Sequence, residues 1–217
     1  MSTKKLFNKP FDDGTIAKLL IFENYLNSWL PTFILASGNK PIQIFDLFAG
    51  AGYDSEKTEG SPLRSLRIIN KFKDLLNNFN KSVYMYLNDT NSTNISNLKI
   101  ICKNKINEYG LEDIVKLTYS EIPFNTFITK HNSILNNGCN LIFADQYGLK
   151  EINENVFKTL INFPFTDFIF FISSSVLHRF PDEPEIKKHH PKFDFDKIRN
   201  CDQKNIHNVV CQEYRKY

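Results

Sequence analysis

Apolar positions along the chain change between a helical and an extended spacing, and this alternation predicts a series of helices and strands. In residues 16–35 they recur every three or four positions, which predicts an amphipathic helix interrupted at Pro31. Further along the chain, β-prone runs alternate with helical spacings. The predicted strands are residues 42–48, 83–87, 114–119, 140–145 and 167–172, and the predicted helices between them are 62–76, 93–109 and 153–163.

The order of these elements predicts an α/β fold. Strands that are apolar almost throughout suit a mostly parallel sheet that is covered by helices on both faces. We therefore expect a Rossmann-like sandwich, with a helical segment at 1–40, a cofactor-binding domain at 41–180 and a charged segment at 181–217. No further strands follow the fifth, so the fold is expected to be truncated at its C-terminal end or capped by an unusual tail.

Composition narrows the class of protein only a little. The chain has 217 residues, 41% of them hydrophobic and 24% charged, as in one ordinary globular domain. A formal charge of +3 does not by itself indicate a nucleic-acid binder. The four cysteines are far apart, and neither a secretory signal nor a bilayer-spanning apolar run is present. These features predict a cytoplasmic protein that does not associate with a membrane.

The clearest candidate for a binding site is a glycine loop directly after the first predicted strand. Glycines at the carboxyl end of a parallel strand allow a ligand to approach the backbone, although the same loop could be a plain tight turn. The residues expected to contact a cofactor here are Asp46, Phe48, Ala49, Gly50 and Gly52.

A carboxylate at the end of the second strand extends this site. Asp89 can accept both hydroxyl groups of a ribose, or it can instead cap the strand end and the following helix. Dinucleotide-binding loops prefer three glycines and an acidic residue about 20 positions later. Because the loop here is shorter and Asp89 lies farther away, S-adenosylmethionine (SAM) fits the pattern better than NAD.

The segment after the fourth strand predicts the substrate side of the site. Asp145 could accept a hydrogen bond from an exocyclic amino group while Tyr147 stacks on a planar base, with Gln146 as a further substrate contact. These two candidate catalytic residues could also be a turn-stabilising acid and a packed aromatic ring.

Other polar groups are weaker candidates. Glu121, after the third strand, could lie against an adenine ring or simply be solvated, and Arg179 could bind a phosphate or form a surface ion pair. Histidines and cysteines of the C-terminal segment could bind zinc, but without a C-x-x-C pair a solvated tail is favoured and no metal site is expected. They are His189, His190, Cys201, His207 and Cys211.

Three motifs give the chain a family resemblance. Residues 45–50 (FDLFAG), 60–64 (GSPLR) and 145–148 (DQYG) resemble, in this order, the three-Cys-motif partner proteins, and residues 25–31 (YLNSWLP) are similar too. The resemblance covers roughly residues 15–180. It implies a Rossmann-like methyltransferase fold and a partner with a three-cysteine, radical-SAM-like motif. The family usually has Asp-Pro-Phe-Gly where this chain has Gln146 and Tyr147, and it continues beyond the fifth strand.

Two functions follow from these observations. The first is a SAM-dependent methyltransferase that acts on a nucleic acid or nucleotide. The second is a non-catalytic Rossmann-like protein that binds a three-cysteine-motif protein or a nucleic acid.

Overall fold

The computed structural model describes residues 9–146 and 151–217, which form two compact units. The sheet unit consists of Met1–Asp145 and Pro164–Ile169, and the C-terminal unit consists of Gln146–Phe163 and Phe170–Tyr217. In the described part of the chain, no helix is both long and apolar enough to cross a membrane.

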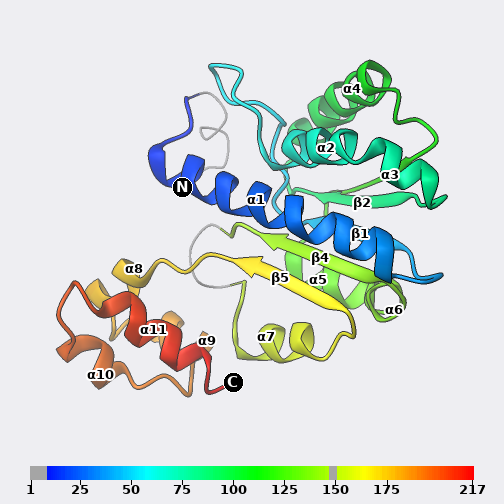
Figure 1. The fold of residues 1–217 in the computed structure, drawn as a ribbon. Coiled ribbons are helices and arrows are strands. Elements are labelled where there is room, and N and C mark those ends of the chain that lie inside the picture. Colours follow the sequence, from blue (N-terminus) through cyan, green and yellow to red (C-terminus); the bar gives the residue numbers. More distant parts are fainter. Residues whose placement is uncertain (1–8, 147–150) are drawn as a thin grey trace. The chain divides into compact units, whose positions relative to one another are not determined.

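A five-stranded parallel sheet forms the centre of the sheet unit (Figure 1). The spatial order of the strands is β3-β2-β1-β4-β5, and β1 therefore has β2 and β4 as neighbours. All five strands predicted from the sequence are present, and the α/β fold is confirmed. Their bounds are β1 Ile42–Asp46, β2 Val83–Asn88, β3 Val115–Ser120, β4 Cys139–Ala144 and β5 Thr166–Phe170.

Helices cover both faces of this sheet. Figure 1 shows α1 (Asp13–Ala36) crossing in front of the strands and α5 (Phe124–Lys130) behind them. Phe22 of α1 stacks on Phe143 of β4 at 4.2 Å between ring centroids, whereas Phe45 of β1 meets Phe127 of α5 at 6.1 Å. Because side chains alternate along a strand, these contacts define which residues of each strand face α1.

The N-terminal helix differs from the prediction at Pro31. The helix is not interrupted there but continues to Ala36 with the proline inside it. Proline removes one backbone hydrogen bond, and the burial of Trp29, Leu30 and Ile34 around it holds the helix together. Tertiary packing therefore outweighs the local preference.

The helices after β1 and β2 follow the predicted spacings. The predicted helix 62–76 is divided at Phe72 into α2 (Ser61–Lys71) and α3 (Lys73–Asn78). The next helix, α4 (Ser92–Tyr109), ends at Gly110, whose φ of 60° is the left-handed conformation that favours glycine. Two short helices before β4, α5 and α6 (Asn132–Asn137), were not predicted.

The C-terminal unit is built from helices around aromatic rings. His190 is fully buried and stacks on Phe193, and Tyr214 packs edge-on against both of them. The interpretation of this segment as a solvated tail is therefore wrong for His190, because the aromatic rings exclude water from it. The helices are α7 Glu154–Ile161, α8 Ser174–Arg179, α9 Pro184–His189, α10 Phe195–Asn200 and α11 Ile206–Tyr214.

Candidate functional site

The glycine loop leaves β1 at the carboxyl edge of the sheet and is held by backbone hydrogen bonds to both neighbouring strands. The Leu47 N–H donates to the Phe143 carbonyl at 3.0 Å, and the Ala49 N–H donates to the Asn88 carbonyl at 2.9 Å. Gly50 then adopts a φ of 64°, which an L side chain rarely takes. The loop is thus fixed at the position where ligands of open α/β sheets bind.

Gly52 serves the packing of a helix. Its φ is 95°, and a Cβ atom added there would lie 3.2 Å from the Cδ1 atom of Leu98 in α4. The absence of a side chain therefore lets α4 approach the loop. A direct contact between Gly52 and a cofactor stays a prediction, as it does for the buried Ala49 and for Phe48, whose ring stacks on Phe124 at 5.7 Å.

Asp89 braces the glycine loop. Its Oδ2 atom accepts hydrogen bonds from the Gly50 N–H at 3.0 Å and from the Asn94 side chain at 3.2 Å. Its Oδ1 atom accepts from the Asn91 N–H at 2.7 Å, next to the start of α4. Of the two alternatives for this residue, the structural one is visible in these bonds. The ribose contact stays a prediction, for which the half-buried carboxylate retains further lone pairs.

Asp46 has the most unusual environment at this edge. It is fully buried, and within the described residues its Oδ2 atom has no hydrogen-bond partner. Burial raises the pKa of Asp46 to about 7, and the Asp145 and Asp89 carboxylates act in the same direction. Hydrogen bonds from Ser61 and from the Phe48 N–H oppose the rise but do not cancel it.

Asp145 forms an ion pair that the sequence did not predict. The Lys18 ammonium of α1 donates to its Oδ1 atom at 2.6 Å. Lys18 precedes Phe22 by one helical turn, and Asp145 follows Phe143 by two positions, directly after the end of β4. The helix rises about 6 Å from Lys18 to Phe22, and an extended chain advances about 6.6 Å from Phe143 to Asp145. Because these two lengths are similar, stacking of the two rings brings the two charges together.

The remaining predicted substrate residues belong to the C-terminal unit or lie outside the described residues. The Gln146 Oε1 atom accepts from the Glu151 and Ile152 N–H groups, both at 3.1 Å, and so shapes its own loop. Arg179 is exposed, with its guanidinium 5.8 Å from the centre of the Phe180 ring. Tyr147 lies outside the described residues.

Glu121 is exposed after β3, and its contact with an adenine ring stays a prediction. Among the described residues, no group of three or more His, Cys, Asp or Glu side chains is placed to hold a metal ion.

The motif 60–64 is connected to the glycine loop at several points. The Gly60 N–H donates to the Gly52 carbonyl at 2.8 Å, and Ser61 hydrogen-bonds to Asp46. Arg64 is buried, with its Nε–H donating to the Glu59 carbonyl and its guanidinium pairing with Glu23 at 2.7 Å. The sequence analysis used this motif only for the family resemblance and assigned it no chemical role. A serine at the start of a helix beside the ligand-binding edge could have indicated a contact with the site.

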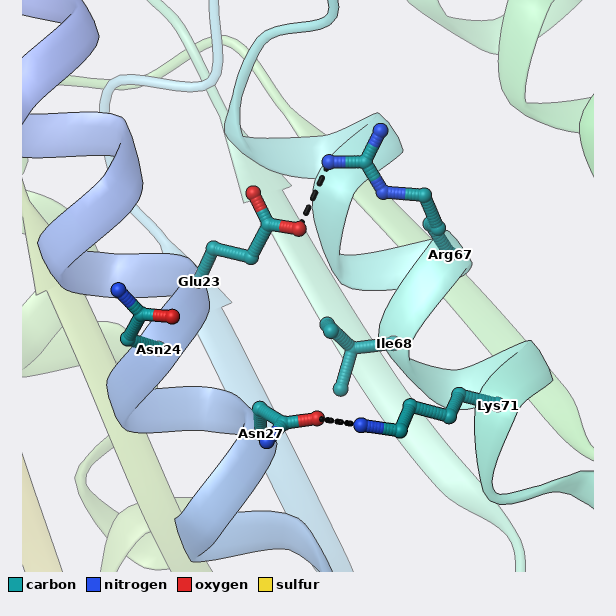
Figure 2. Close-up of a pocket in the computed structure, with 6 residues that line it drawn as sticks. All are labelled: Glu23, Asn24, Asn27, Arg67, Ile68 and Lys71. Carbon is teal, nitrogen blue, oxygen red and sulfur yellow. Dashed lines mark hydrogen bonds and ion pairs between the residues drawn. The ribbon is translucent and has the colours of Figure 1, made fainter.

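A polar groove lies between α1 and α2 (Figure 2). In this groove Arg67 pairs with Glu23 at 2.7 Å, and the Lys71 ammonium donates to the Asn27 side chain at 2.7 Å. Ile68 supplies an apolar wall. These charged groups already have partners on the opposite helix, so their contacts hold α1 and α2 together. The groove is therefore a weaker candidate for a binding site than the edge at Asp46.

Comparison with known proteins leaves the family open. No family model matches the chain, and no curated protein matches it. It is similar at 15% identity to a Staphylococcus aureus protein assigned as a caffeoyl-CoA O-methyltransferase, with a TM-score of 0.41 over 96% of this chain and 74% of that one. It is also similar at 15% identity to the SAH-bound methyltransferase PaMTH1 of Podospora anserina, with a TM-score of 0.36 over 95% and 86% of the two chains.

Proposed function

We propose that the chain is a SAM-dependent methyltransferase whose cofactor binds at the carboxyl edge of β1, β2 and β4. The observation that carries this proposal is the buried Asp46 Oδ2 atom, which has no hydrogen-bond partner among the described residues. An unpaired buried acceptor costs about 1–3 kcal/mol. Such a cost at a ligand-binding edge is explained if a ligand donor occupies the position.

The chemistry of this edge fits SAM. An amino-acid ammonium group would provide the donor that Asp46 lacks, and the backbone at Gly50 permits a close approach. Asp46 and Asp89 give the edge a negative character suited to a cationic ligand. When bound, this cofactor supplies a methyl group attached to a positively charged sulfur.

For the methyl acceptor we propose a nucleic acid or nucleotide, as the residue types at Asp145 and Tyr147 suggest. Asp145 lies beside Asp46, two positions beyond its β4 partner Phe143. It is 20% exposed and can therefore reach a ligand while being partly shielded from water. The contribution expected from these residues is orientation of the acceptor.

Calorimetry with SAM and its demethylated product S-adenosylhomocysteine (SAH) tests cofactor binding. Asp46→Asn should weaken both affinities about tenfold or more, because the ammonium loses a charged acceptor. Asp113→Asn, at an exposed position before β3, is the matched control and should bind like the wild type. No heat with either ligand at millimolar concentration would contradict the proposal.

Transfer of radiolabelled methyl groups to DNA, RNA and nucleotides then tests catalysis. Labelling that is lost in Asp145→Asn at saturating SAM would support the acceptor-side role of this residue. Cofactor binding without transfer to any of these acceptors would favour the non-catalytic partner.

A further inference from the structure

Lys18 and Asp145 form a half-buried ion pair at the carboxyl edge of the sheet. Their Nζ and Oδ1 atoms are 2.6 Å apart, and the side chains are 31% and 20% exposed. The pair joins residues 127 positions apart, from α1 and from the end of β4. It is therefore a product of tertiary packing and is close enough to solvent for a ligand to reach it.

The position of this pair is fixed from two sides. Phe22 holds α1 on β4 through its stack with Phe143, and the Tyr25 hydroxyl donates to Asp167 of β5 at 2.9 Å. Lys18 is one turn before Phe22, on the same face of the helix. The ammonium is thus brought to Asp145 by a helix that is packed against two strands.

Asp145 is close to the orphan acceptor of Asp46. Asp46 pairs with Phe143 in the parallel register of β1 and β4, and Asp145 lies two residues beyond Phe143, directly after the end of β4, where its charge acts on Asp46. The Cα atoms of Asp46 and Asp145 are separated by one strand spacing across the sheet and by two residues along the chain, which together give roughly 8 Å. In SAM only a short chain of bonds separates the ammonium from the sulfur, so a ligand with its ammonium at Asp46 can place its sulfur near Asp145.

We infer that the Lys18–Asp145 pair controls the preference of this site for the charged methyl donor over its neutral product. This inference rests on the proposed function. SAM and SAH differ by one methyl group and one positive charge. With the pair intact, the Lys18 ammonium balances the attraction of the Asp145 carboxylate for that charge. The site then binds SAM and SAH with similar affinity and can release the product.

Substitution of either partner should change the affinity ratio in opposite directions. Lys18→Met leaves the Asp145 carboxylate unbalanced and should favour SAM over SAH by about fivefold relative to the wild type. Asp145→Asn removes the carboxylate and keeps the ammonium, and it should favour SAH by about fivefold. The double variant should return close to the wild-type ratio, and Lys18→Arg should keep it.

Calorimetric titration of the full chain with SAM and with SAH measures these ratios without any methyl acceptor. Lys71→Met is the matched control, because it removes the same charge from α2, where Lys71 contacts Asn27 nine residues further along α1 than Lys18 (Figure 2). Circular dichroism verifies that each variant is folded. An ion pair that solvent can reach contributes about 1 kcal/mol or less to stability, so folded variants are expected.

The outcomes separate this inference from the proposed function. Binding of both ligands with opposite changes of the ratio in the two single variants supports the inference. Binding with unchanged ratios, or with the same change in Lys71→Met, overturns the inference and leaves the proposed function intact. Absence of binding to the wild-type chain overturns the proposed function and the inference with it.

Discussion

Asp46 in the sheet unit and Glu213 in the C-terminal unit are both fully buried carboxylates, and in each one oxygen has no hydrogen-bond partner among the described residues. Glu213 is otherwise well supported. Its Oε2 atom accepts from the Asp194 N–H at 2.9 Å and from the Lys216 ammonium. Asp46 receives hydrogen bonds from Ser61 and from Phe48, and among the described residues no Lys or Arg pairs with it.

The difference separates a structural carboxylate from one that is suited to a ligand. A buried charge with a cation and a backbone donor can keep a local fold together. A buried carboxylate without a cation is destabilising when ionised, and its pKa rises. The second situation is typical of functional sites, where a binding group is retained in spite of its cost.

Asp46→Asn should produce the largest change in stability, and it should be stabilising. Burial raises the pKa of Asp46 from 3.8 to about 7, so the native state binds a proton more tightly than the unfolded state and stability falls as pH rises through this window. Above this pH window, ionised Asp46 lowers the free energy of unfolding by roughly 4 kcal/mol, and substitution by asparagine removes this loss.

Urea unfolding of the wild type and of Asp46→Asn measures this effect. The two proteins should be similar at about pH 3.5, where Asp46 is mostly protonated in both states, and should differ most at about pH 8. A difference that does not depend on pH would contradict the assignment of an ionised, unpaired Asp46.

Glu213→Gln should have the opposite sign. The substitution removes a charge that is paired with Lys216 and leaves the Asp194 N–H with a weaker acceptor. We expect a loss of about 1–3 kcal/mol in the free energy of unfolding at neutral pH. Urea unfolding followed by tyrosine fluorescence measures it, because Tyr214 lies within the same aromatic cluster. Stabilisation by this change would remove the distinction between the two carboxylates.

Ser61→Ala should sharpen the comparison from the side of Asp46. The Ser61 hydroxyl hydrogen-bonds to the Asp46 carboxylate and lowers its pKa, so its removal should raise that pKa further. One hydrogen bond to a charged group corresponds to about 1.5–3 kcal/mol, or about one to two pKa units. Carbon-13 NMR of the Asp46 carboxyl group gives the titration midpoint, and an unchanged or lower midpoint would contradict the role of Ser61.

Lys216→Met should have the smallest effect, because it makes Glu213 more similar to Asp46 but acts through an exposed partner. The Lys216 side chain is 46% exposed, so solvent screening limits its contribution to about 0.5 kcal/mol. Chemical denaturation at low and high salt measures it, with a smaller difference expected at high salt. A loss as large as that of Glu213→Gln would mean that the cation alone supports this carboxylate.

Much of the sheet unit could be predicted from local patterns. Short apolar runs identified all five strands, and Gly110 marked the end of α4 through its left-handed conformation. Asp46, Asp89 and Asp145 could be placed at one edge because parallel strands end there. Short elements such as α5 and α6 were missed, since one or two helical turns contain too few apolar positions to show a period.

The sequence by itself therefore determined the type and order of the main elements and the carboxylates at the ends of β1, β2 and β4, because these depend on near neighbours in the chain. Only the tertiary structure decided the partners of those carboxylates. Lys18 reaches Asp145 through the packing of Phe22 on Phe143, and Ser61 reaches Asp46 through the packing of α2. Burial, which decides the charge of Asp46, depends on how distant segments exclude water, and no local spacing records it.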